Sequence, residues 1–586
     1  MAEIDGSGRH GEMRPAARQG RIALPTTPGS HIRPDWAGAS RPPGYGPEDP
    51  VDGDQRGLAT LMSVGAGDAA ASLPTPDGTS RAAEERPGWI RSVPWPLAAI
   101  LIAQAALSLR LVWSNTANTN EAQYLWAGHL EWAHWLHGTT LPLLPKFFSG
   151  APVIYSPLGA LADSIGGLAG ARILSLCFML GATTLLWSTT SRLYGRDAAF
   201  FASALWAFLG PTLMLGAYAT HDAMSLFLVA LATWCATAHR TRDEATGWMV
   251  TAAAALALAN AAQYASAIFD PIVVLLAVLT AWPRPGGKAA LRRGALLITC
   301  TFGILYLALR FTGTDYKTGI TQTVLMRASG TASVSAVLGH AGVWVGTVAA
   351  LACASVVLSA IRRQDTNCTL LLAVLAGGAL LAPLEQARIH TLISLDKHAD
   401  FGAWFAAIAA GYAIDQAAVK LRPVALRAAA TAAAGGAIAA VAIAGFAQAQ
   451  ALMASWPSAT GFINALRPIV ARTHGPLLIE ASPLGEYYLP AGSQWNRWSN
   501  TYGIQLMSGA TAGRVPGSVN TAGDPVVYAK FISRGYFSII ALNSGATPAL
   551  DNDIEADIAR TPGYHIIGWS SYGGTDNPIW AYKDTR

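Results

Sequence analysis

The amino-acid sequence predicts an α-helical polytopic membrane protein with about eleven spans and a small extracytoplasmic α/β domain at its C-terminal end. Composition is the first evidence, because 52% of the 586 residues are hydrophobic and only 13% are charged. Soluble domains usually carry about a quarter charged residues. The second observation is the arrangement of charge, since the short polar loops on one side of the apolar segments are all basic. Both features are typical of helices that cross a bilayer several times.

Loop charge also predicts the orientation in the membrane, because positively charged loops remain in the cytoplasm during insertion. The basic loops are residues 192–196, 239–242, 284–293, 362–363 and 420–427. Threading the apolar segments between them places Glu121, Asp222 and residues 385–398 on the outer face. We therefore expect a multi-pass plasma-membrane protein with a cytoplasmic N-terminus and an extracytoplasmic C-terminal domain. The net charge of +5 is small and indicates no nucleic-acid partner, since cytoplasmic loops that contact membrane lipids account for the basic residues.

Three regions follow one another along the chain. Residues 1–90 are rich in Gly, Pro, Ala and Arg and have no apolar period, which predicts a disordered cytoplasmic tail. Residues 91–449 form the predicted membrane domain. Residues 450–586 are polar with short β-like runs, which predicts the α/β domain. The runs expected as strands are residues 476–480, 536–542, 565–569 and 579–582.

Within the membrane domain, apolar runs close to the length that crosses a bilayer alternate with polar turns. The predicted spans are residues 94–113, 168–190, 197–216, 223–238, 248–265, 268–282, 294–312, 338–361, 369–384, 401–418 and 428–449. After the first span, residues 114–167 form a long outer loop, and loops of this length are usually functional. Its Trp126, Trp132 and Trp135 predict an amphipathic helix at the membrane surface, because aromatic rings favour the head-group zone.

Four short motifs lie in this loop or close to it in the predicted topology. They are NTNEAQY at 118–124, GAPVIYSPL at 150–158, GARILS at 170–175 and ATHDA at 219–223. This series resembles the C-type (GT-C) glycosyltransferase superfamily in its family 39-like branch, which includes protein O-mannosyltransferases and the aminoarabinose transferases of lipid A. The resemblance covers roughly residues 95–240. It implies an enzyme that takes a sugar from a polyprenyl-phosphate lipid.

The motifs supply candidates for the chemistry that this resemblance implies. The acceptor hydroxyl loses a proton as it attacks the anomeric carbon, and Glu121 is our candidate base because burial makes a carboxylate more basic. The alternative for Glu121 is a solvated acid at a helix start. Asp222 opens an apolar span, which predicts a helix N-cap, a second catalytic group that orients the acceptor or a basic partner, or both. The candidate site is completed by residues that would position donor or acceptor, namely Asn120, Tyr124, Tyr155 and His221.

The first motif also bears on metal binding. The Asp-Glu pair that is frequent in the family is Asn120-Glu121 here, so one carboxylate remains in the motif. A lone carboxylate is a poor site for a divalent cation, which takes several oxygen ligands. We therefore expect no metal ligand among the site residues and no cofactor, while dependence on a divalent metal stays open.

A second outer loop carries several ionisable groups at a place where topology gives no reason for positive charge. Its basic residues would cradle the donor phosphate and stabilise it as it leaves; they are Arg388, His390, Lys397 and His398. The alternative is a salt-bridged connection in which these cations pair with Glu385, Asp396 and Asp400.

These features together predict a hexosyl- or pentosyltransferase that moves a sugar from a polyprenyl-phosphate donor to a glycan, lipid or protein acceptor at the outer face. The alternative is a transporter or flippase of a lipid-linked sugar, in which charge pairs would lie near the middle of the bilayer. Ionisable groups gather at one face here, which favours the enzyme. The five cysteines lie in or beside predicted spans, so we expect no disulfide framework outside.

Overall fold

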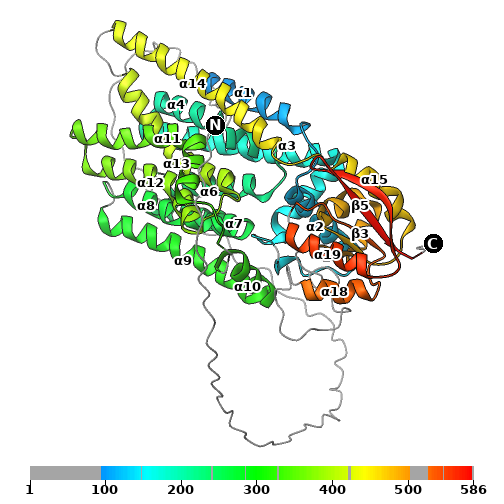
Figure 1. The fold of residues 1–586 in the computed structure, drawn as a ribbon. Helices are drawn as coiled ribbons and strands as arrows, with labels where there is room; N and C mark the ends of the chain where they lie inside the picture. Colours follow the sequence, from blue (N-terminus) through cyan, green and yellow to red (C-terminus); the bar gives the residue numbers. More distant parts are fainter. Residues whose placement is uncertain are drawn as a thin grey trace, which may run out of the picture. The chain divides into compact units, whose positions relative to one another are not determined.

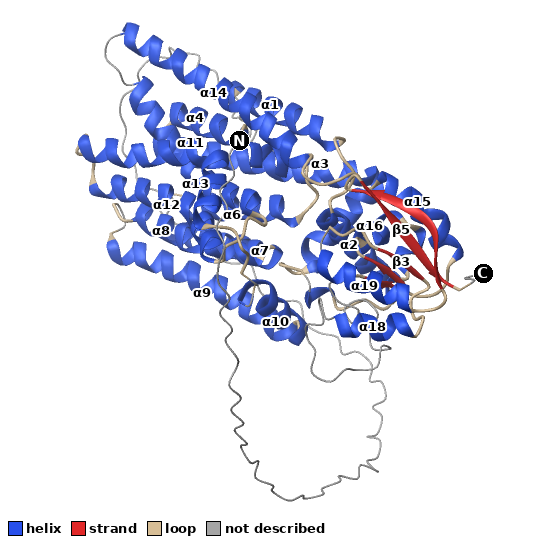
Figure 2. Ribbon diagram, viewed as in Figure 1, coloured by secondary structure: helices blue, strands red, loops and turns tan. Residues whose placement is uncertain are grey.

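The computed structural model describes residues 94–583 except 147, 239–241, 284–285, 326, 328, 420–423, 502–524 and 546. The predicted tail at residues 1–90 lies outside the described residues, as do parts of three basic loops. Helices form most of the described chain, and strands occur in its C-terminal part (Figure 1 and Figure 2).

Long apolar helices confirm the class of fold that the composition predicts. Among the described residues, seven stretches are long and apolar enough to cross a membrane. They lie in α1 (Trp95–Val112), α3 (Pro152–Tyr194), η2 with α8 (Tyr264–Phe269 and Asp270–Ala281), α9 (Gly287–Phe311), α11 (Val334–Ile361), α12 (Thr366–Arg388) and α14 (Val424–Met453). The remaining predicted spans correspond to helices that are shorter or more polar, namely α4 with α5 (Arg196–Ala207 and Gly210–Leu215), α6 (His221–Ala236), α7 (Arg242–Ala262) and α13 (Leu395–Ile414).

Helix α13 is more polar than a lipid-facing span because it lies inside the helical bundle. All of its residues from Ala399 to Ala413 are buried. Two glycines let its neighbours approach closely. A Cβ on Gly402 would lie 2.4 Å from the Gly378 carbonyl oxygen of α12, and one on Gly411 would lie 2.3 Å from the Ala198 carbonyl oxygen of α4. The first turn of α13 carries Lys397 and His398.

The predicted outer loop 114–167 is largely helical. Helix α2 (Thr119–His137) fills the part in which the tryptophans predict an amphipathic helix, and α3 already begins at Pro152. Helix α3 breaks at Gly166 and Gly167, where Gly167 has a φ of +61°, a value that glycine adopts at no steric cost. The break separates the first segment of α3 from the predicted span 168–190.

The C-terminal part contains the predicted α/β domain. Its five-stranded sheet has the order β2-β1-β3-β5-β4, with β1, β2 and β3 parallel and β5 antiparallel to both β3 and β4. The strands are β1 (Leu477–Ile479), β2 (Trp498–Ser499), β3 (Ile539–Ala541), β4 (Tyr564–Tyr572) and β5 (Thr575–Tyr582). The four strands that the sequence predicts are therefore present, and the two-residue β2 is additional. Helices α15 (Thr460–Arg472) and α16 (Ser482–Tyr488) cover one face, and α18 (Pro525–Ser533) and α19 (Pro548–Arg560) cover the other.

This domain packs on helix α2 through α16 and the turn that follows it. The indole nitrogen of Trp126 donates a 2.9 Å hydrogen bond to the carbonyl oxygen of Gly492. The Tyr487 hydroxyl donates to Asp163 of α3 at 2.5 Å. The Tyr488 hydroxyl accepts a hydrogen bond from the Ala117 backbone at 2.8 Å. Helix α2 is thereby held between the membrane helices and the C-terminal domain.

Candidate active site

A cavity of about 320 Å³ brings together residues from α2, the segment before α3, the start of α6, the end of α7, the segment after α10 and the start of α13. Its polar lining includes Asn120, Tyr124, His221, Asp222, Lys397 and His398 from the predicted site. The lining also contains Arg327 and Gln263, which the sequence does not single out. These residues come from six places in the chain, so only the folded structure assembles the site.

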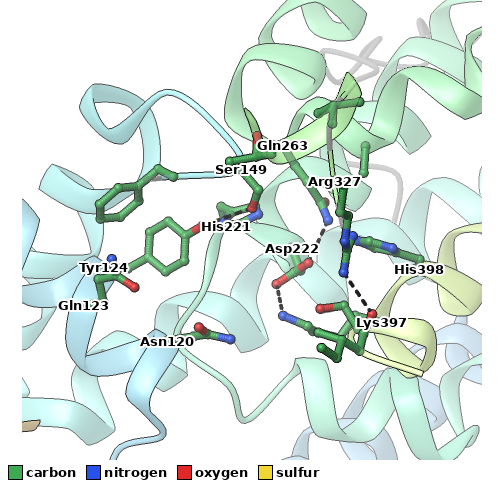
Figure 3. A pocket seen from close by; sticks show the side chains of 16 residues that line it. Asn120, Gln123, Tyr124, Ser149, His221, Asp222, Gln263, Arg327, Lys397 and His398 are labelled. Atoms are coloured by element: carbon green, nitrogen blue, oxygen red, sulfur yellow. Dashed lines mark hydrogen bonds and ion pairs between the residues drawn. The ribbon is translucent and has the colours of Figure 1, made fainter. Parts of the chain in front are cut away.

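Asp222 lies at the centre of this cavity, in the first turn of α6 (Figure 3). It is 1% exposed, and each carboxylate oxygen has a partner. Oδ2 accepts hydrogen bonds from Lys397 Nζ at 3.1 Å and from Thr220 Oγ1 at 2.6 Å, and Oδ1 accepts one from Gln263 Nε2 at 2.8 Å. The N-cap of α6 is Thr220, so Asp222 does not have the N-cap role that its sequence position allows.

A basic wall lines one side of Asp222. Lys397 is paired with Asp222, and its ammonium also lies 5.3 Å from the centre of the Tyr218 ring. His398 Nδ1 lies 3.0 Å from the amide nitrogen of Gln386. A guanidinium nitrogen of Arg327 lies 3.4 Å from the Ile393 carbonyl oxygen, which holds this side chain against the start of α13. Two basic side chains, Lys397 and Arg327, and an imidazole therefore face a single carboxylate among the described lining residues.

An uncharged wall lines the other side. The Tyr124 ring packs edge-on against Phe148, with centroids 4.8 Å apart, and against His221 at 4.6 Å. Its hydroxyl lies 3.5 Å from Ser149 Oγ. Burial raises the pKa of the Tyr124 phenol above its ordinary value, so it stays protonated and neutral. Tyr155 packs behind Tyr124 at 6.1 Å and is not among the residues that line the cavity.

Glu121 lies away from the cavity, in a buried ion pair with Arg172 of α3. The two side chains are 0% exposed and form two hydrogen bonds of 2.8 and 2.7 Å. Glu121 also accepts hydrogen bonds from the backbone nitrogens of Ala219 at 2.8 Å and Asn118 at 2.9 Å. A general base needs a free lone pair within reach of the substrate proton. The geometry therefore argues against Glu121 as the base, and a structural role fits it instead.

The four basic residues of the second predicted outer loop also separate into residues that line the cavity and residues that do not. Arg388 is 69% exposed in its side chain and is held by Glu385 through bonds of 2.8 and 2.6 Å, so it does not line the cavity. His390 is also outside the cavity, with Nδ1 3.0 Å from the Ala332 carbonyl oxygen. For Arg388, the alternative of a salt-bridged connection describes the structure. Of the predicted phosphate ligands, Lys397 and His398 face the cavity.

The residues present do not fit a divalent cation. Within the described part of the chain, no group of three or more His, Cys, Asp or Glu side chains could hold a metal ion. The Asp222 oxygens are already occupied by an ammonium, a hydroxyl and an amide. Mg²⁺ usually binds through one or two carboxylates together with waters and substrate phosphates, and the one carboxylate of the described lining is already paired with Lys397.

Comparison with solved structures defines the class of the fold. The chain is similar to ArnT from Cupriavidus metallidurans in its apo state, with a TM-score of 0.55 and 14% identity over 83% of this chain and 97% of that one. The same protein bound to undecaprenyl phosphate gives a TM-score of 0.53 with 14% identity, over 84% and 98%. The apo oligosaccharyltransferase of Archaeoglobus fulgidus gives 0.51 with 15% identity, over 85% and 75%.

The fold is therefore that of the C-type membrane glycosyltransferases. No protein-family model matches the sequence. No curated protein matches it either.

Proposed function

We propose that this protein is a membrane glycosyltransferase that moves a sugar from a polyprenyl-phosphate donor to an acceptor hydroxyl at the outer face of the plasma membrane. The main support for this proposal is the cavity in which a buried carboxylate, Asp222, lies beside a basic wall. The similarity to ArnT bound to undecaprenyl phosphate supports a lipid-phosphate donor, because the two chains share a fold over most of their lengths.

The basic wall suits the donor phosphate. Arg327 and Lys397 can form charge-assisted hydrogen bonds to phosphate oxygens, and His398 can donate one from its ring. Such donors stabilise the phosphate most strongly when it leaves, because negative charge develops on it as the bond to the sugar breaks. Permanent cations on the protein serve this purpose without a metal ion.

Asp222 is the base in this proposal. The acceptor oxygen forms a bond to the anomeric carbon while the bond from that carbon to the phosphate oxygen breaks. The acceptor proton moves to a carboxylate oxygen of Asp222, and the electron pair of the broken bond stays on the polyprenyl phosphate. Oδ1 accepts one hydrogen bond, from Gln263, so it keeps a lone pair for the proton while Lys397 stays on Oδ2.

A binding experiment tests the basic wall. Purified protein in nanodiscs is titrated with undecaprenyl phosphate, comparing Arg327→Ala and Lys397→Ala with Lys530→Ala, which removes an exposed lysine of α18. Each wall variant should weaken binding by roughly 1.5–3 kcal/mol, the value of a hydrogen bond to a charged group. Unchanged binding in both wall variants would contradict the assignment. Arg327→Ala serves as the check if Lys397→Ala, which leaves Asp222 without its ion pair, does not fold.

A second experiment separates the transferase from the alternative of a transporter or flippase. Mass spectrometry of cell-envelope glycans and glycoproteins is performed on cells with and without the protein, and with Asp222→Asn. A sugar that disappears in both, and that the purified protein in detergent transfers from its lipid phosphate to an envelope extract, supports bond formation, because detergent leaves no membrane to transport across. An unchanged envelope would contradict the transferase.

A further inference from the structure

The two walls of the cavity differ in charge. Figure 3 shows Asn120, Gln123 and Tyr124 of α2 on one side of Asp222, and the basic side chains on the other. The basic side fits the phosphate of the donor, so the α2 side is left for the sugar. The hydrogen-bonding groups on the α2 side therefore influence which sugars can bind.

The α2 side offers hydrogen bonds without charge. Asn120 and Gln123 carry amides, and Ser149 and Tyr124 carry hydroxyls. Such groups donate to and accept from sugar hydroxyls equally well. The neighbouring Phe148 adds a ring edge against which the apolar face of a sugar can pack.

An amino sugar would meet a poorer environment. A buried ammonium is costly unless a carboxylate pairs with it. Asp222, the one carboxylate among the described lining residues, already has Lys397 as its ionic partner. The neighbouring acid on α2, Glu121, is turned toward Arg172 and has no exposed surface. Helix α2 thus presents the amide of Asn120 to the cavity and keeps its carboxylate away from it.

We propose that the α2 wall selects a sugar that carries hydroxyls and no amino group, with Asn120 as a specificity-determining residue. This inference rests on the proposed function, because it takes the sugar to arrive on a lipid phosphate. The position of Asn120 makes it testable. Its side chain is exposed in the sugar-free protein, so a charge there is hydrated until a sugar covers it, and Asn120→Asp should fold.

The test compares two donors that differ in one group. Undecaprenyl phosphate bearing glucose and undecaprenyl phosphate bearing glucosamine are titrated into the purified protein in nanodiscs, beside sugar-free undecaprenyl phosphate. The wild type should bind the glucose lipid about tenfold more tightly than the glucosamine lipid, the factor equivalent to one unpaired charge-assisted contact. Asn120→Asp should bring this ratio close to one or reverse it. Asn552→Asp, the same change at an exposed position of α19, should leave the ratio unchanged.

The outcomes separate this inference from the proposed function. Equal binding of the two sugar lipids by the wild type, with sugar-free undecaprenyl phosphate still bound, would overturn the inference alone. A ratio that Asn120→Asp leaves unchanged would overturn the role of Asn120. Failure of sugar-free undecaprenyl phosphate to bind would instead count against the phosphate-binding wall and so against both. Gln123→Glu, which adds a carboxylate to the same wall, repeats the test if Asn120→Asp does not fold.

Discussion

Replacing Glu121 by Gln distinguishes a structural acid from a catalytic one. The carboxylate accepts hydrogen bonds from Arg172 through both oxygens and from the backbone nitrogens of Ala219 and Asn118. Gln keeps the shape but replaces one acceptor oxygen with a donor and removes the charge. Arg172, which is 0% exposed, is then a buried cation without its counter-ion. Breaking one partner of a buried ion pair destabilises a protein by roughly 3–5 kcal/mol.

The assay is unfolding of the detergent-solubilised protein, followed by tryptophan fluorescence. Glu121→Gln should unfold at a clearly lower denaturant concentration than the wild type, whereas Glu385→Gln, which breaks the exposed pair with Arg388, should change the midpoint little. The double variant Glu121→Gln with Arg172→Met should recover part of the loss, because it removes the uncompensated charge. A Glu121→Gln protein with wild-type stability and no transfer activity would refute this reasoning and restore Glu121 as the base.

Three further predictions follow from the site and the C-terminal domain. Asp222→Asn should lower turnover by roughly 10²–10⁴-fold with undecaprenyl phosphate binding retained, as single-turnover kinetics would measure; wild-type turnover would remove Asp222 from the mechanism. Burial raises the pKa of Glu486 in α16 from 4.5 to about 8, so the folded domain binds a proton that the unfolded chain releases. The contribution of this protonated carboxyl to stability is therefore complete below about pH 4.5 and is lost as the pH rises through about 8. Glu486→Gln should flatten the fall in the denaturation midpoint between about pH 6 and pH 9. An equally steep fall in the variant would contradict this assignment. A chelator should leave transfer activity unchanged, since the lining does not fit a divalent cation, and loss of activity that added Mg²⁺ or Mn²⁺ restores would show that the site is incompletely assigned.

Much of the fold was predictable because its signals are local. Apolar runs, basic loops and alternating strands each depend on neighbouring residues, and the runs at 476–480 and 536–542 contain β1 and β3. Strand β2 has two residues, which is too short for a periodic pattern. The first helical segment of α3 was also not predictable from the sequence, because Gly166 and Gly167 separate it from the long apolar run of the span.

The site was less predictable because its contacts join distant parts of the chain. Lys397 and Asp222 are 175 positions apart, and the hydrogen bond from Gln263 spans 41 positions. Gln263 and Arg327 belong to no motif that spacing could reveal. Which of two neighbouring side chains faces a cavity also depends on the tertiary contacts of their helix. The capping-box spacing of Asn118 and Glu121 is a local signal that could have predicted the structural role of Glu121, because it places the carboxylate at the start of the helix.

The two walls of the cavity are held in place by different packing contacts. The lysine and imidazole of the basic wall project from α13, whose backbone contacts at Gly402 and Gly411 leave no room for larger side chains. The uncharged wall includes Asn120, Gln123 and Tyr124 of α2, which contacts the C-terminal domain through the Trp126–Gly492 hydrogen bond, while Tyr488 binds the Ala117 backbone just before α2. On the proposed function, the sugar-facing wall and the base are therefore held by different parts of the protein. A chimaera that replaces α2 and the C-terminal domain as one unit should change the sugar that is accepted and keep the lipid carrier.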